Sequence, residues 1–164
     1  MSTSFTRRTT LALLGTLGTL PFVRPSFAQA STVEVAMLNK DPNNPRNRNV
    51  FEPRVVKIKA GDTVKFVSTD KGHNAVTTKG MLPDGAEAFK TKISKDEEVT
   101  FTQPGIYGYH CTPHFALGMV GVIIVEGEGM AANLEAAKEV KQRGKARKVM
   151  EEIWAEIEEK NLLA

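Results

Sequence analysis

One short segment of the chain gathers side chains that bind soft metal ions. Cys111, His114 and Met119 lie in it, and His73 supplies a second imidazole from upstream. Thiolate and thioether ligands favour Cu(I), whereas imidazole also suits Cu(II), so a mixed set tolerates both oxidation states. Two His and one Cys in a trigonal plane, with a long axial Met, are typical of blue-copper electron-transfer centres. The ligand types therefore predict one copper ion that passes single electrons.

Zinc is the main competing metal, because Cys and His also suit it. Structural zinc sites usually carry more Cys and no Met, which favours copper. Each residue alone has a plainer interpretation: a free Cys or a single Met commonly fills a core, and a lone His is commonly a surface residue. The metal interpretation is stronger because the chain has one Cys and three His, two of which stand in the required relation to that Cys.

The ligands need a hairpin to bring them together. We expect a strand ending at 107–111, a turn at 112–118 that contains Pro113 and Gly118, and a second strand from Met119 onward. Such a hairpin places Cys111, His114 and Met119 around one point. Strand alternation directs Cys111 inward beside Tyr109.

Short strands elsewhere complete the predicted fold. Alternating apolar residues indicate strands at 33–38, 54–59, 63–68, 98–101, 107–111 and 120–125. Turn residues separate them, as at Ala60-Gly61-Asp62 and Gln103-Pro104-Gly105. This spacing predicts an all-β sandwich. The polar segment 41–49 predicts a surface loop.

The C-terminal part has a helical period instead. From about Ala131, Asn133 is expected to cap a helix that runs through Gln142, and Gly144 to end it. A second predicted helix over 145–160 carries an apolar face made of Ala146, Val149, Met150, Ile153, Trp154 and Ile157. We expect both helices to pack on the sandwich, and the acidic residues of the second helix to face solvent.

The N-terminus has the features of a cleaved export signal. Arg7 and Arg8 precede an uncharged stretch at 11–23, and Ala28-Gln29-Ala30 supplies a small-x-small cleavage signal. The stretch is shorter than the roughly 20 residues that span a bilayer, so we expect a signal peptide at 1–30 and no membrane span. The paired arginines leave general secretory and twin-arginine export both open.

Removal of this segment leaves a chain without net charge. Three of the 22 basic residues, Arg7, Arg8 and Arg24, lie in it, and the remaining ones balance the 19 acidic residues. The basic balance of the whole chain therefore gives no reason to expect nucleic-acid binding. The single Cys excludes an internal disulfide. We expect one monomeric domain, divided into a copper-binding part at 31–127 and a helical extension at 128–164.

Several segments of the chain resemble the cupredoxins. They are MLNK at 37–40, VFEP at 50–53, AGDTVKF at 60–66, TDKGHN at 69–74, KGMLPDGAEAFKTKI at 79–93, CTPHFALGMVGV at 111–122 and ANLEAAK at 132–138. The resemblance covers nearly all of the mature chain. It implies a periplasmic type 1 copper carrier with a Greek-key sandwich, two C-terminal helices, and metal ligands at His73, Cys111, His114 and Met119.

The resemblance also implies supporting residues around the metal. The carbonyl of Gly72 is expected near the copper, Asn74 is expected to bond towards the Cys sulfur, and Pro113 follows in the ligand loop. Such contacts hold ligands in place and tune the reduction potential. Gly-His-Asn is also ordinary turn chemistry, so Asn74 has a plainer interpretation as a turn residue.

An exposed edge of His114 is the expected place of electron exchange. An apolar collar surrounds it, made of Pro113, Phe115, Ala116 and Leu117. Lys40, Lys71 and Lys90 match lysines that ring this edge in the family, and each could equally serve only solubility. His110 stands where a further lysine is common, which predicts a titratable group near neutral pH. The segment 41–49 is longer than is usual in the family.

By resemblance, the partner is a copper-containing or cytochrome-type nitrite reductase, another denitrification reductase or a c-type cytochrome, docked transiently. Two other classes of function fit less well. A thiol hydrolase would not need Met119, and a copper catalyst would need further His ligands where only His110 is left over. A copper storage or delivery protein would favour clustered Met or Cys, whereas the remaining Met residues are scattered.

Overall fold

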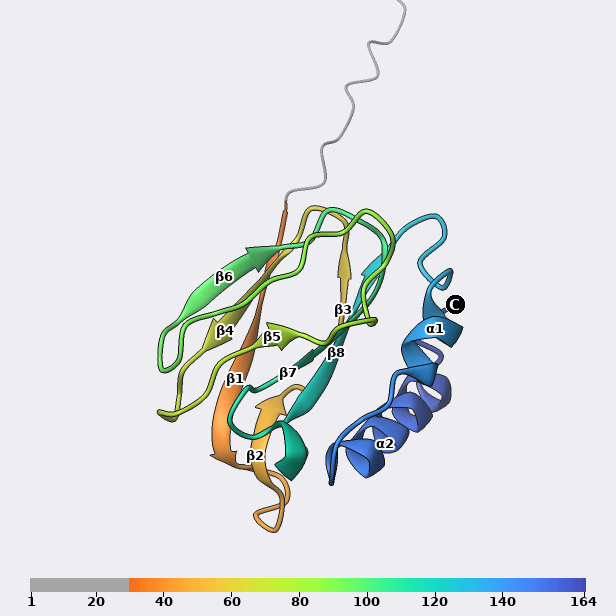
Figure 1. Ribbon diagram of the computed structural model, residues 1–164. Helices are drawn as coiled ribbons and strands as arrows, with labels where there is room; N and C mark the ends of the chain where they lie inside the picture. Colours follow the sequence, from red (N-terminus) through yellow and green to blue (C-terminus); the bar gives the residue numbers. More distant parts are fainter. Residues whose placement is uncertain (1–29) are drawn as a thin grey trace, which may run out of the picture.

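The computed structural model describes residues 30–164, in which two four-stranded sheets face each other (Figure 1). The first sheet has the order β2 (Arg48–Glu52), β1 (Thr32–Lys40), β4 (Thr63–Val67), β6 (Glu97–Thr100). The second has the order β3 (Val55–Lys59), β8 (Val120–Glu126), β7 (Gly105–His110), β5 (Val76–Thr77). The predicted export signal lies outside the described residues, apart from its last position.

Both sheets mix parallel and antiparallel pairs. β1 runs parallel to β4, and β3 runs parallel to β8, while the other neighbours are antiparallel. The helices α1 (Leu134–Glu139) and α2 (Ala146–Glu159) follow the last strand and lie on the second sheet (Figure 1). The predicted all-β sandwich with two C-terminal helices is confirmed.

Two strands, β2 and β5, were not predicted from the sequence. β5 is only two residues long, and β2 begins inside the polar segment that was expected to be a loop. Arg48 and Asn49 belong to β2 because Arg48 pairs with Lys40 across the hairpin. Their polar side chains give no strand signal, since strand patterns depend on alternating apolar residues. The surface loop is therefore shorter at its C-terminal end than predicted.

Aromatic rings fill the space between the sheets. Tyr109 is fully buried, with its ring centroid 4.7 Å from that of Phe51 and 5.3 Å from that of Phe66. Edge-to-face pairs of this kind add stability beyond the area that they bury. Cys111 is fully buried in the same cluster, as the alternation along its strand predicts. The metal-binding end of the hairpin is therefore anchored in the main core.

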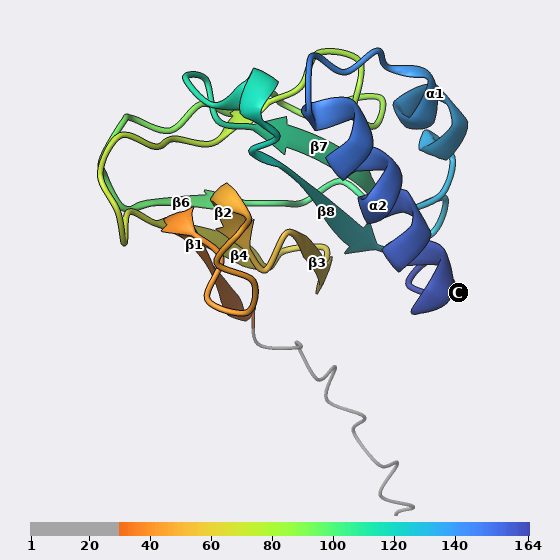
Figure 2. The ribbon, with the colours of Figure 1, turned by 90° about the horizontal axis from the view of Figure 1, so that it is seen from below.

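A second core lies between β8 and the helices. α2 directs its apolar face at the sheet, where Met150, Ile153 and Ile157 meet Val122 and Ile124 of β8 (Figure 2). β8 is consequently buried on both faces and consists almost entirely of apolar residues. Among residues 30–164, none of the helices has the length and apolar character needed to cross a membrane.

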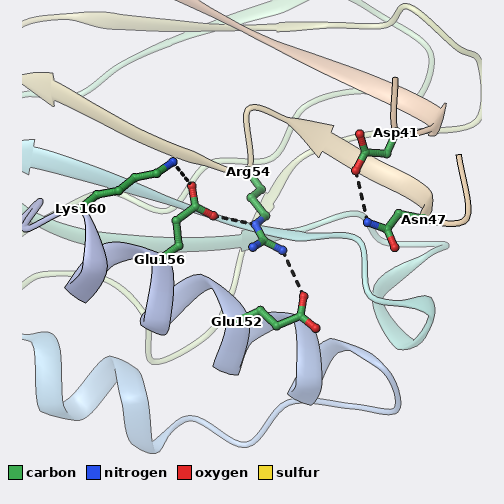
Figure 3. A network of polar contacts seen from close by, with 6 residues as sticks. All are labelled: Asp41, Asn47, Arg54, Glu152, Glu156 and Lys160. Carbon is green, nitrogen blue, oxygen red and sulfur yellow. Dashed lines mark hydrogen bonds and ion pairs between the residues drawn. The ribbon is translucent and has the colours of Figure 1, made fainter. Parts of the chain in front are cut away.

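Ion pairs tie the outer side of α2 to the sandwich. Arg54 contacts Glu156 at 2.9 Å and Glu152 at 3.3 Å, and Lys160 contacts Glu156 at 2.7 Å (Figure 3). The prediction that the acidic residues of this helix face solvent is wrong for Glu156, which is half-buried, whereas Glu152 is exposed. Partly exposed pairs of this kind each contribute little stability. The network connects α2 to the segment between β2 and β3, where Arg54 lies.

The first helix is shorter than predicted and is not capped by its Asn. α1 ends at Glu139 rather than Gln142. Asn133 stands at the N-cap position, but its side chain accepts from the N–H of Ile106 at 3.0 Å and donates to the carbonyl of Ile106 at 2.8 Å. It thus binds β7 instead of the helix. Sequence alone favours the local cap because it does not show the neighbouring strand.

Candidate metal centre

The loop between β7 and β8 is closed by its own backbone. The N–H of Cys111 donates to the carbonyl of Met119 at 3.0 Å, and the N–H of His114 donates to the carbonyl of Cys111 at 3.2 Å. A 3-10 turn, η1 (Phe115–Leu117), fills the middle, and Gly118 ends it at a φ of 100°, a conformation that favours glycine. The predicted hairpin therefore brings Cys111, His114 and Met119 to one end of the sandwich.

Three donor atoms converge at this end. The ligand atoms of His73, Cys111 and His114 all lie within 4.8 Å of one another. The Cys111 Sγ is 3.5 Å from the Nδ1 of His114 and 3.9 Å from the Nδ1 of His73, and the two Nδ1 atoms are 3.0 Å apart.

This triangle of donor atoms has the size that one metal ion requires. Bonds of about 2.0 Å to imidazole and about 2.3 Å to thiolate, as zinc makes, place such donors roughly 3.5 Å apart. A soft set of one thiolate and two imidazoles suits copper in both oxidation states. The residues present therefore fit a copper ion. Met119 is fully buried in the same core cluster as Cys111, so a thioether is available beside the triangle.

His73 is delivered by the loop between β4 and β5 and is fully buried. The preceding Gly72 has a φ of 90°, which allows the chain to turn into the site. Ser94, in the loop between β5 and β6, holds this turn with two hydrogen bonds. Its Oγ accepts from the N–H of Gly72 at 2.9 Å, and its own N–H donates to the carbonyl of His73 at 2.9 Å. The backbone around the first imidazole is thus fixed in two places.

Asn39 orients the ring of His73. Its Oδ1 lies 3.0 Å from the Nε2 of His73. The backbone N–H of Asn39 in turn donates to the Asp70 carboxylate at 2.6 Å. Since a carbonyl oxygen can only accept, the proton of the neutral ring resides on Nε2 and leaves the Nδ1 lone pair facing the sulfur. A second group that fixes the tautomer is characteristic of metal-binding His residues.

Asn74 links the two loops that carry the ligands. Its Oδ1 accepts from the N–H of Thr112 at 2.9 Å, and its Nδ2 donates to the Thr112 Oγ1 at 3.2 Å. Asn74 is almost fully buried, so these bonds are shielded from water. The side chain thus ties the segment after Cys111 to the segment after His73.

Burial favours the uncharged forms of Cys111 and His73 when no metal is bound. Burial raises the pKa of the Cys111 thiol, although hydrogen bonds from the backbone of Asn74 and His114 oppose this in part. Burial lowers the pKa of His73, and the adjacent His114 lowers it further, while Asp70 acts in the opposite direction. A metal ion must therefore displace the thiol proton but meets a neutral imidazole.

The predicted docking residues lie around this end of the molecule. Pro113, Ala116 and Leu117 are exposed, whereas Phe115 and His114 are half-buried. Leu117 has 51% of its surface exposed, which is unusual for a large apolar side chain. The three predicted lysines, Lys40, Lys71 and Lys90, are also exposed.

His110 supports the collar instead of standing free at its rim. Its ring stacks on Phe115 with 4.4 Å between centroids, and its Nδ1 lies 2.9 Å from the Thr78 Oγ1. Burial lowers the pKa of His110, and Arg143 lowers it further. Both effects favour the neutral form of the ring, and the titration of His110 near neutral pH stays a prediction. A contact with a partner through His110 stays a prediction.

Sequence reasoning missed two residues of the site, Asn39 and Ser94. Asn39 lies next to Lys40 in a segment that had been used only for its resemblance, and its one signal is a polar amide at the end of an apolar strand. Ser94 has a φ of 61° in a polar turn, which no sequence pattern distinguishes from an ordinary loop.

The sandwich and its cluster of two His and one Cys define a copper protein of the cupredoxin class. The family model described as copper binding proteins of the plastocyanin/azurin family matches residues 40–126. The chain therefore belongs to this family. Within it, the chain is similar to the pseudoazurins, which confirms the resemblance seen in the sequence.

Pseudoazurins match over most of the chain. The chain is 45% identical to pseudoazurin of Paracoccus pantotrophus, over 84% of this chain and 90% of the relative. It is 42% identical to that of Methylorubrum extorquens, over 80% and 85%. The crystal structure of pseudoazurin from Methylobacterium extorquens AM1 superposes with a TM-score of 0.70 at 43% identity, covering 77% of this chain and 98% of that one. The chain is thus a copper-binding electron carrier and not an enzyme.

Proposed function

We propose that this chain is a periplasmic type 1 copper electron carrier whose ligands are His73, Cys111, His114 and Met119. The observation that carries the proposal is the convergence of two Nδ1 atoms on one buried Sγ, with the triangle set in a closed loop. A bound copper ion would gain and lose one electron while the protein around it keeps its shape. Gly72, Asn74 and Pro113 are proposed to support the ligands.

The protein holds the metal ligands in fixed positions and offers a path by which the electron can leave. Asn39 holds His73, and Asn74 joins the two ligand loops, so neither ligand segment has to move when the charge at the site changes. His114 is the half-buried member of the set, and it lies beside the exposed collar residues Ala116 and Leu117. We infer that the electron leaves through the ring of His114.

The partner is proposed to be a nitrite reductase, of the copper or cytochrome type, or a c-type cytochrome. Among residues 30–164, Lys40, Lys71 and Lys90 form no ion pair, so their charges are available to an acidic protein. Such charges mainly raise the association rate, and the small apolar collar permits rapid release. This favours a transient complex with a monomeric carrier.

The proposed location rests on the sequence of the first 30 residues, which has the order of basic, apolar and small residues found in export signals. We propose that cleavage leaves a single domain, with the copper-binding part at 31–127 and the helical extension at 128–164. Determining the N-terminal residue of the protein recovered from the periplasm tests both statements. A chain that keeps residues 1–30 in the cytoplasm would contradict them.

Stopped-flow mixing of the reduced carrier with oxidised copper nitrite reductase tests the electron path. Leu117→Asp places a like charge in the collar facing an acidic partner, so we expect the second-order rate to fall by about tenfold at low salt. Thr32→Asp is the control, because it adds the same charge at an exposed position at the end of β1 far from Lys40 and outside the collar. Equal rates for the two variants would contradict docking at the collar.

A further inference from the structure

A broad groove lies beside the collar, between the β1–β2 loop and α2. It encloses about 980 Å³ and is lined by Arg46 and Arg48 on one side and by Lys145 and Lys148 on the other, with Leu117 at its edge. Figure 2 shows β2 with its loop on one side of β8 and α2 on the other. None of the copper ligands lines this groove.

The groove is continuous with the collar. The N–H of Lys145 donates to the carbonyl of Ala116 at 2.9 Å, so the start of α2 is joined directly to η1. A Cβ atom at Gly118 would lie 3.0 Å from Val149 and 3.6 Å from the Cβ of Lys145, so the two segments are in close contact there as well. A partner seated on the collar therefore meets the groove without a gap.

The available charge in the groove is positive. Arg46, Arg48, Lys145 and Lys148 are all exposed, and none of them forms an ion pair within residues 30–164. Among the four acids that line the groove, Glu152 and Glu156 are paired with Arg54 and Lys160. Asp41 accepts from the N–H groups of Asn43 and Asn44, and Glu52 is half-buried. The lining has six basic residues against these four acids, so its net charge is positive.

One of these cations, Arg48, is held against Lys40, the residue before Asp41 of the groove lining. Lys40 and Arg48 are direct cross-strand partners of β1 and β2, and like charges in that position destabilise a sheet. The loop between them is built to keep its shape, because Asp41 bonds the backbone of Asn43 and the side chain of Asn47 (Figure 3). A carboxylate that binds near both side chains would relieve the repulsion between Lys40 and Arg48.

We propose that this groove receives an acidic segment of the same redox partner protein that docks on the collar. The proposal rests on the proposed function, and it adds a second contact, so that the docking surface extends on one side of the collar towards α2. Carboxylates of the partner would lie between the β1–β2 loop and the first turn of α2. This contact would set the rotation of the partner about the collar, because a charged patch on one side fixes a single orientation.

Charge reversal on each wall of the groove tests the proposal. With the copper-loaded protein and oxidised copper nitrite reductase at low ionic strength, Lys148→Glu and Arg46→Glu should each lower the second-order rate about tenfold, an effect that disappears at high salt. Lys59→Glu is the matched control, since it makes the same charge change on an exposed lysine at the far end of β3, outside the groove. It should lower the rate by about twofold or less.

The pattern of rates separates this proposal from the proposed function. If Lys148→Glu and Arg46→Glu behave like Lys59→Glu while Leu117→Asp is still slow, the groove is not a contact, although the carrier function stands. If all variants react like the unchanged protein, docking at the collar fails as well. Retention on vesicles of anionic lipid at physiological salt, lost on Lys148→Glu, would assign the groove to a membrane and overturn the proposal.

Stability supplies a second readout. Arg48→Glu replaces the like-charge pair with an attractive one opposite Lys40, so the variant should unfold at a higher urea concentration while it reacts more slowly with the reductase. A variant that is less stable and slower would indicate that Arg48 merely supports the fold, which would count against the proposal.

Discussion

The Nε2 of His73 lies 3.0 Å from the Oδ1 of Asn39, on the side of the ring opposite to the Cys111 sulfur. An amide oxygen can only accept a hydrogen bond, so the Nε2 of the neutral ring carries the proton. The unprotonated Nδ1 is therefore the nitrogen that faces the metal position. Asp70 holds the backbone of Asn39 in place, so the arrangement extends one residue further from the site. The ligand geometry therefore depends on a strand that carries no ligand.

Asn39→Ala should weaken copper binding without unfolding the protein. Loss of a hydrogen-bond partner behind a metal-bound His typically lowers metal affinity by about 10-fold to 100-fold. Competition with a copper chelator measures the change. Asn43→Ala, an exposed amide of the β1–β2 loop, is the control and should bind copper as the unchanged protein does. Equal affinities for the two variants would show that the Asn39 contact is incidental.

Met119→Leu should raise the reduction potential and keep the fold. Leucine leaves the metal with three donors instead of four, and a lower coordination number suits Cu(I) better than Cu(II). The axial ligand is known to tune this potential. Met81→Leu is matched to it, since Met81 is equally buried but belongs to the second core. Voltammetry of both variants checks the prediction. A rise for Met81→Leu, or none for Met119→Leu, would argue against Met119 as a ligand.

Gly144→Ala should disturb the copper loop directly from the turn that precedes α2. A Cβ at this position would lie 2.5 Å from the Ala116 carbonyl oxygen, and the φ of 54° adds about 1 kcal/mol of strain. Gly129→Ala has a similar backbone penalty at a φ of 76° but meets open space.

Urea unfolding and the visible spectrum of the copper protein separate the two glycine variants. Both should lose stability, and only Gly144→Ala should also change the spectrum, because only its Cβ reaches the loop that carries His114. Identical spectra would show that the loop yields to the added methyl group without moving the ligands.

The metal-free protein should lose stability as the pH falls below about 6.5, the ordinary pKa of His. Burial lowers the pKa of both His73 and His110, so the unfolded chain binds more protons than the folded one in this range, and stability rises with pH. Each group contributes at most about 1.4 kcal/mol per pH unit. Urea unfolding between pH 5 and 7 gives the slope.

His110→Gln isolates one of the two contributions. The variant cannot gain a proton, so its stability should depend less steeply on pH than that of the unchanged protein over the same range. A slope that does not change would show that His110 is protonated as easily in the folded state as in the unfolded one, contrary to its burial against Phe115.

The sequence predicts the copper hairpin well because its signals are local. Cys111, His114 and Met119 belong to one loop, so residue type and spacing are enough to place them together. The apolar face of α2 is likewise visible from its helical period, and Met150, Ile153 and Ile157 are buried as that pattern indicates.

The features that sequence missed all depend on neighbours that are distant in the chain. Asn133 satisfies Ile106 of β7 instead of its own helix, and Asn39 at the end of β1 meets His73 from the loop after β4. Burial and the charge of Arg143 lower the pKa of His110, whose Nδ1 lies 2.9 Å from the Thr78 Oγ1, although its residue type alone suggests a charge near neutral pH. Tertiary contacts decide these three, and no local pattern encodes them.

The colour of the Cu(II)-loaded protein tests the central claim most directly. If His73, Cys111, His114 and Met119 form a blue-copper site, the protein absorbs strongly in the visible range, bleaches when ascorbate reduces it and recovers on oxidation. Cys111→Ser should abolish the colour, because the intense band requires the thiolate. A colourless Cu(II) complex, or a colour that survives Cys111→Ser, would contradict the account.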